Sequence, residues 1–135
     1  MKHQNLQIRT KQSALEVIKF SEGLPKDDTS RILGRQLLRS GTSVGANYRA
    51  ACRARSRKEF IAKMGIVEEE ADESQFWLEL LLERGPVDPQ RASPLREEAG
   101  RIVAMTVASI RTARQASTST PHHALRTPHS GRGCS

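Results

Sequence analysis

Residues 31–82 decide the fold, and their sequence is RILGRQLLRSGTSVGANYRAACRARSRKEFIAKMGIVEEEADESQFWLELLL. At about 100° per residue, six arginines up to position 57 fall in one helical sector about 80° wide, opposite an apolar stripe. The basic sector contains Arg31, Arg35, Arg39, Arg49, Arg53 and Arg57. The apolar stripe contains Leu33, Leu37, Val44, Tyr48 and Ala51. This pattern predicts a long helix that is basic on its outer side and apolar on its inner side.

The second half of this stretch repeats the scheme with acidic residues. Its apolar and small residues step alternately by four and three, which is typical of a coiled-coil-like seam. They are Phe60, Met64, Val67, Ala71, Ser74, Leu78 and Leu81. Ser56 and Glu59 have the spacing of a capping box, in which each side chain accepts from a free backbone amide. We therefore expect two helices joined near Ser56, the second ending at Gly85-Pro86.

Small residues occupy the middle of the first of these helices, at positions 40–46. Ser, Gly and Thr are weak helix formers, so propensity alone would break the helix here. The apolar phase set by Leu33 and Leu37 nevertheless resumes unshifted at Val44 and Tyr48. We therefore expect one unbroken helix over 29–55, approached closely by another helix along its small residues.

Two further helices are expected on either side of this pair. The first covers 6–22, with a narrow inner face of Ala14, Leu15, Ile18 and Ser21, and ends at Gly23 to Pro25. The last starts at Ser93-Pro94 and runs to about residue 115. Residues 117–135 are rich in Ser, Thr, Pro, His, Gly and Arg without periodicity, so we expect them to be disordered. The predicted fold is all-α: an antiparallel up-down-up-down four-helix bundle over 1–116, followed by a disordered C-terminal tail.

The length and composition of the chain fit one soluble domain. The chain has 135 residues and a formal net charge of +7, a balance that suits nucleic acid or an anionic surface. The N-terminus lacks the apolar core of a signal peptide, and no apolar run is long enough to span a membrane. With only Cys52 and Cys134 present, free thiols in the cytoplasm are the simpler expectation.

No residue pattern favours an enzyme. Residues 41–45 read Gly-x-Ser-x-Gly, but the nucleophile elbow needs a strand before the serine, whereas these flanks are helical. The acids at 68–73 lack the Glu-x-x-His pairs of a di-iron bundle, and no histidine occurs between His3 and His122. We expect no catalytic residues, cofactor, metal or small-molecule substrate.

Charge separates sharply between the two central helices. Residues 26–58 hold nine Lys or Arg and two Asp, whereas 59–83 hold eight acids and one lysine. Three interpretations remain open. The basic stripe, about 40 Å long, could follow a phosphate backbone. It could instead meet the acidic face of a neighbouring subunit or a partner protein in a scaffold. Both could also be ordinary solvated faces.

Three segments carry a resemblance to a known family. They are SVGANYRAA at 43–51, SRKEFI at 56–61, and FWLELL at 76–81 together with Glu70. In these segments the chain resembles the bacterial four-helix-bundle family of 23S rRNA intervening-sequence proteins, which is similar to the accessory protein of diversity-generating retroelements. Many relatives carry Asn-Ile-Ala-Glu where this chain has Asn47-Tyr48-Arg49-Ala50. The missing acid and the added Arg49 make the stripe more basic.

The resemblance implies a cytoplasmic homo-oligomer, a pentamer, that binds nucleic acid, with RNA favoured over DNA. It supplies no catalytic residues. Our candidate phosphate contacts are Arg35, Arg39, Arg49, Arg53, Arg57 and Lys58. Our candidate subunit contacts are Ser43, Gly45, Asn47 and Trp77.

Overall fold

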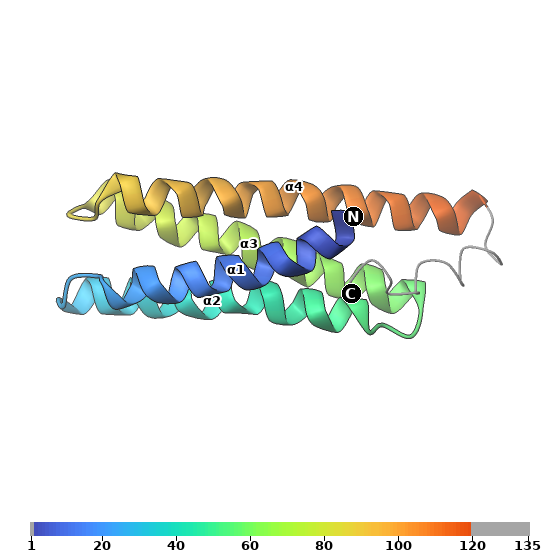
Figure 1. The fold of residues 1–135 in the computed structure, drawn as a ribbon, viewed down its shortest axis with the longest axis horizontal. Helices are drawn as coiled ribbons and strands as arrows, with labels where there is room; N and C mark the ends of the chain where they lie inside the picture. The colour runs from blue at the N-terminus through green and yellow to red at the C-terminus, as the bar shows by residue number, and fades with distance from the viewer. Residues whose placement is uncertain (1, 120–135) are drawn as a thin grey trace.

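A computed structural model describes the backbone of residues 2–119 and the side chains of residues 6–116. Its elements are α1 (Lys2–Glu22), α2 (Asp28–Cys52), α3 (Arg57–Arg84) and α4 (Pro89–Ser119). In Figure 1 each helix runs alongside the next in the opposite direction, and short turns join them. The predicted all-α four-helix fold is confirmed.

The predicted unbroken helix through the small residues is confirmed as well, because α2 is continuous across positions 40–46. A Cβ atom added at Gly41 would lie 2.9 Å from Cγ1 of Val17 in α1. One added at Gly45 would lie 3.3 Å from the backbone oxygen of Thr10. The glycines therefore let α1 pack closely on α2, and tertiary contact compensates for their weak helix propensity.

The two helices are joined near Ser56 as predicted, but α2 ends three residues earlier than predicted. Cys52 is the last residue of α2 and Arg53 is its C-cap, so the basic sector does not continue around one axis to Arg57. Ser56 caps α3 as expected, accepting from the amide of Glu59 at 3.0 Å. The Glu59 carboxylate, however, accepts from the amide of Arg55 at 2.9 Å rather than from that of Ser56.

The predicted inner face of α1 is wrong. Leu15 is 51% exposed and Ile18 is 36% exposed. The buried row is instead Leu6, Thr10, Val17 and Phe20, followed by Leu24 after the helix. The buried row includes a threonine. The prediction relied on apolar residues and therefore selected the wrong side of the helix.

The start of α4 also differs from the prediction. The helix begins at Pro89, where the Asp88 carboxylate accepts from the amide of Gln90 at 2.9 Å, and Pro94 lies inside it. Asp88-Pro89 thus supplies the cap and the tolerated first-position proline that we had assigned to Ser93-Pro94. The helix extends to Ser119, and the rest of the predicted tail lies outside the described residues.

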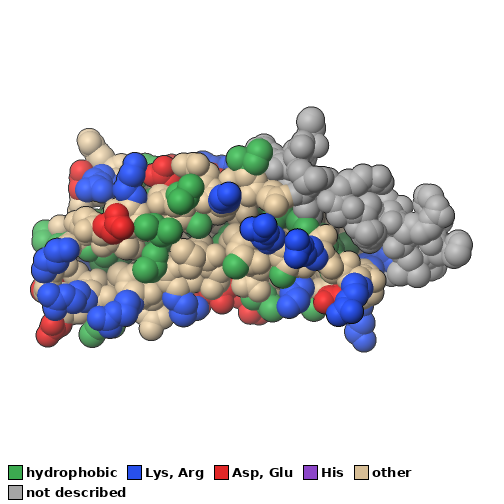
Figure 2. All heavy atoms as spheres, turned by 60° about the horizontal axis from the view of Figure 1, so that its bottom comes forward, with side chains coloured by type: hydrophobic (Ala, Val, Ile, Leu, Met, Phe, Trp, Pro, Cys, Tyr) green, Lys and Arg blue, Asp and Glu red, His purple; other side chains and the backbone are tan. Residues whose placement is uncertain are grey.

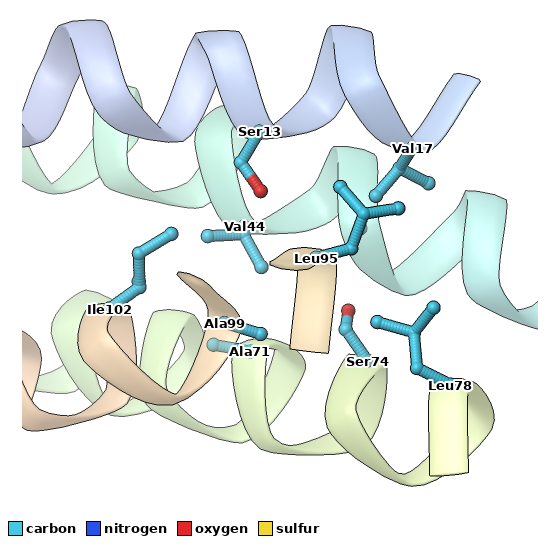
Figure 3. Close-up of a pocket in the computed structure, with 10 residues that line it drawn as sticks. Ser13, Val17, Val44, Ala71, Ser74, Leu78, Leu95, Ala99 and Ile102 are labelled. Atoms are coloured by element: carbon cyan, nitrogen blue, oxygen red, sulfur yellow. The ribbon is translucent and has the colours of Figure 1, made fainter. Parts of the chain in front are cut away.

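All four helices meet in the core. Their side chains enclose a cavity of about 10 Å³, room for one water at most (Figure 3). Its lining includes Val17 of α1, Val44 of α2, Ser74 of α3 and Ile102 of α4. The centre of the bundle is therefore packed, and any binding partner has to use the outside.

Two further findings bear on the sequence expectations. No helix within residues 2–119 has the length and apolar character needed to cross a bilayer. The expectation of free thiols is wrong for Cys52, which is disulfide-bonded. The other cysteine of the chain, Cys134, lies outside the described residues.

Candidate nucleic-acid interface

Five of the six predicted phosphate contacts are exposed. One is Arg39, and the other four are Arg35 and Arg49 on α2, Arg53 at its C-cap and Lys58 in the first turn of α3. Within the described residues, none of these four side chains forms an ion pair. Their charges are therefore available to a partner.

Arg39 is engaged within its own subunit. Its guanidinium pairs with Glu70 at 3.3 Å and also with Glu73, both on α3. The basic face of α2 and the acidic face of α3 thus meet inside one chain. Part of the charge separation seen in the sequence is neutralised there, and Arg39 is a weaker candidate for a phosphate contact than predicted.

Arg57 corrects the predicted stripe most clearly. It is the first residue of α3, and only 5% of it is exposed. Because its side chain is buried, Arg57 does not belong to the exposed stripe. The prediction failed because it extended the α2 angular phase past Cys52, where that helix ends.

Basic residues outside the predicted set enlarge the site. Arg55, in the turn before α3, is exposed, as is Arg111 on α4. Residues 49–63 contain six basic residues and a single acid, Glu59. Local charge density alone could have selected Arg55, whereas Arg111 lies far from it in the sequence, on α4. We call the exposed residues Arg49, Arg53, Arg55 and Lys58 the basic end of the bundle.

At the opposite end two exposed arginines have acidic partners. Arg31 pairs with Asp28 at 3.3 Å, and Arg84 pairs with Asp27 at 3.1 Å. Hydrogen bonds from the amide and hydroxyl of Ser30, together with the charge of Arg84, hold the pKa of Asp27 below its usual value. These paired arginines contribute little net field, so the α1–α2 end differs from the basic end.

A partly buried ion pair links α1 to α4. Arg9 donates from Nε and Nη2 to the two carboxylate oxygens of Glu98, at 2.9 and 2.7 Å. Arg101 adds a third bond to Glu98 at 3.0 Å. Burial opposes ionisation of Glu98, but hydrogen bonds from the two arginines keep its pKa below the usual value. The pair fixes α1 against α4 and is not part of the exposed charge.

Figure 2 is turned to bring α1 and α2 forward. Lys and Arg side chains extend along this face, with few acidic side chains and a group of hydrophobic ones between them. The exposed large apolar residues include Ile8, Leu15, Ile18 and Ile32, from α1 and α2. The face therefore combines positive charge with uncovered apolar area.

The predicted subunit contacts are largely used within the subunit. Gly45 faces α1, and the Asn47 amide donates to the carbonyl oxygen of Ser43 at 2.9 Å. Trp77 donates from Nε1 to Glu73 at 2.9 Å and stacks edge-on against Phe76, with ring centroids 5.1 Å apart. Phe76 itself is 50% exposed, so it is a better candidate for contact with a second molecule than Trp77.

The described side chains hold no metal site, since no three His, Cys, Asp or Glu residues among them are placed to share an ion. The Gly-x-Ser-x-Gly segment lies inside α2, without the strand and sharp turn of a nucleophile elbow. What distinguishes the described surface is thus the cluster of cations without acidic partners.

These features define a class: a small four-helix-bundle protein with a basic end and a packed interior. The chain belongs to the family of 23S rRNA-intervening sequence proteins, which it matches over residues 4–108. It is similar to the crystal structure of a protein of unknown function from the S23 ribosomal protein family of Bacteroides thetaiotaomicron. The two share 30% identity with a TM-score of 0.77, over 82% of this chain and 99% of that one. No curated protein matches the sequence.

Proposed function

We propose that the protein is a non-enzymatic nucleic-acid-binding bundle of the cytoplasm, with RNA favoured over DNA, that contacts phosphates through its basic end. The observation that supports this most directly is that Arg49, Arg53 and Lys58 are exposed and form no ion pair within the described residues. Elsewhere in the bundle Arg9, Arg39 and Arg84 are paired with acids. The printed name of the family, which refers to 23S rRNA, points to the same class of ligand.

Such a surface would bind the polyanion with little regard to sequence. Arginine binds phosphate oxygens in pairs, and each neutralised phosphate releases condensed counterions. Contacts to the backbone position a protein on nucleic acid but do not read bases. Among the exposed large apolar side chains, Phe76 is the one aromatic, and it lies on acidic α3 rather than at the basic end. Base stacking therefore has little part in the proposal.

A filter-binding assay with structured RNA at graded salt tests the proposal. Arg49→Glu with Arg53→Glu should weaken retention at least tenfold and lower the salt slope by about 1.4–1.8, two phosphate contacts at ~0.7 to ~0.9 each. The matched control is Lys19→Glu with Arg91→Glu, which makes the same charge change at exposed positions of the opposite end. Equal retention by both double variants, each folded, would reject the basic end as the RNA site.

A second role, self-association into a homo-oligomeric scaffold, is favoured by a groove between α1 and α2. The groove has a volume of about 290 Å³. Ile18, Leu24 and Leu38 give it an apolar lining, and Lys26 and Arg35 supply positive charge. The outer side of α3 offers the complement, an exposed Phe76 among acids that include Asp72, Glu79 and Glu83.

We propose that α3 of one copy docks in this groove of the next. Such a head-to-tail contact uses two different surfaces and forms a ring when its rotation closes, as the pentamer implied by the family resemblance requires. Arg35→Glu and Glu83→Arg should each dissociate the oligomer by placing like charges together. Combining both in one chain should restore it in part. Light scattering after size-exclusion chromatography measures the mass, and a wild-type monomer at both low and high salt would reject assembly.

A further inference from the structure

Arg57 is a charged side chain without a partner in the interior. Its side chain is buried, and its Nε and Nη2 atoms form no hydrogen bond with any described residue. Guanidinium does not lose its proton in proteins, so the charge stays in place. A buried charge without hydrogen bonds is strongly unfavourable, and native interiors rarely leave one unsatisfied. The guanidinium is therefore expected to have a ligand.

Arg9 indicates what kind of ligand fits. Its Nε and Nη2 atoms form one edge of the guanidinium, and that edge holds both oxygens of the Glu98 carboxylate at 2.9 and 2.7 Å. In Arg57 the same two atoms are the ones left without acceptors. This edge is matched to two oxygens of one oxyanion, either a carboxylate or a phosphate.

The surroundings favour the more highly charged of these oxyanions. Arg53, Arg55 and Lys58 are exposed within four residues of Arg57 along the chain. Arg57 also opens a helix of 28 residues, whose N-terminus carries partial positive charge. The nearest acid in sequence, Glu59, already accepts from the backbone amide of Arg55. The local field is thus strongly positive and attracts a dianion more than a carboxylate.

We propose that Arg57 anchors a phosphate-binding site at the turn between α2 and α3. The phosphate is either a free ion or a group of bound nucleic acid, and only its assignment to nucleic acid rests on the proposed function. Because Nε and Nη2 are buried, phosphate reaches them only when neighbouring side chains move aside. Bound phosphate then satisfies the empty edge and stabilises the folded state.

Thermal unfolding of the full chain in sodium phosphate and in sodium chloride of equal ionic strength tests the site. Wild-type Tm should be several degrees higher in phosphate and should saturate with phosphate concentration. Arg57→Lys keeps the charge but not the paired N–H edge, so this rise should disappear. Arg91→Lys, the same change at an exposed arginine of the opposite end, should keep it. An equal Tm in the two salts for the wild type, or an undiminished rise in Arg57→Lys, overturns the proposal.

A second measurement does not depend on the folding of a variant. Titrating inorganic phosphate into wild-type protein should shift the NMR signal of one arginine Nε–H group, whereas chloride should not. No shift overturns the site. RNA retention then separates the two sources of phosphate. If Arg57→Lys loses both the phosphate effect and RNA retention, the site holds an RNA phosphate. If it loses only the phosphate effect, the site holds the free ion. A phosphate effect in a wild type that retains no RNA supports the site and rejects the proposed function.

Discussion

Ser40 of α2 and Ser74 of α3 face each other in the interior with their hydroxyl oxygens 2.9 Å apart. Both side chains are buried. The Ser74 hydroxyl lies 2.9 Å from the carbonyl oxygen of Glu70, and that of Ser40 lies 3.3 Å from the carbonyl oxygen of Leu37. The pair is thus satisfied in the core, and it favours one register of α2 against α3 over others that would separate the two hydroxyls.

The energetic coupling of this pair can be measured. Ser40→Ala and Ser74→Ala should each lower the free energy of unfolding by about 1 kcal/mol, because each leaves the other hydroxyl with a poorer partner. The double variant should be clearly less destabilised than the sum, since two apolar side chains leave nothing unsatisfied. Urea unfolding of the four proteins gives the coupling, expected at about 0.5–1.5 kcal/mol. If the effects of the two substitutions were strictly additive, this would contradict an interaction between the two hydroxyls.

The close contact of α1 with α2 predicts opposite effects at two helical glycines. Gly41→Ala should destabilise the protein by about 1–3 kcal/mol, because the new methyl would lie 2.9 Å from the stiff Val17 side chain. Gly65→Ala should stabilise it by up to about 1 kcal/mol, since nothing lies within 4 Å and alanine is the better helix former. Thermal unfolding of both variants provides the comparison. Stabilisation by Gly41→Ala would mean that α1 is easily displaced.

The fold could be predicted from the sequence wherever the residues on the inner side of a helix are apolar or small. The continuity of α2 followed from the phase shared by Leu37 and Val44, and the start of α3 followed from the Ser56 cap. The inner face of α1 could not be found in this way, because Thr10 is buried while Leu15 is exposed. Which side of such a helix is buried depends on where the helix lies among its neighbours.

The candidate site was predictable in composition but only partly in geometry. A helical projection identified Arg35, Arg49 and Arg53 as outward-facing, and all three are exposed. It could not foresee that Arg39 meets acids of α3, because a projection of one helix contains no neighbour. Nor could it foresee the burial of Arg57, because the phase applies only up to the residue where the helix ends.

Two prolines of α4 should respond differently to replacement. Pro94 is exposed and lies inside the helix, where it removes an amide from the backbone ladder. Pro94→Ala should therefore stabilise the protein by about 1–3 kcal/mol. Pro89 is at the first helical position, which needs no amide donor, so Pro89→Ala should change stability by less than about 1 kcal/mol. Chemical denaturation tests both, and destabilisation by Pro94→Ala would mean that the helix starts after it.

Glu98 predicts how stability depends on pH. Burial raises its pKa, but hydrogen bonds from Arg9 and Arg101 outweigh burial, and the folded-state pKa lies below the usual value. A carboxyl group with a lowered folded pKa adds stability above its unfolded pKa and loses it as pH falls through the folded pKa. Glu98→Gln should thus cost about 1.5–3 kcal/mol at pH ~7, where the ion pair is intact. The difference from wild type should narrow below pH ~4, near the unfolded glutamate pKa.

Its neighbour Glu97 provides the control for this prediction. Glu97 is exposed on the same turn of α4, so Glu97→Gln removes the same charge without touching Arg9. Urea unfolding at neutral and acidic pH gives the free energy of unfolding of each variant relative to wild type. This difference should depend on pH for Glu98→Gln and should be almost absent for Glu97→Gln. If the stability difference between Glu98→Gln and wild type persists unchanged in acid, the lost stability comes from packing of the side chain. A protonated glutamate and a glutamine carry the same charge, so the ion pair cannot explain a difference there.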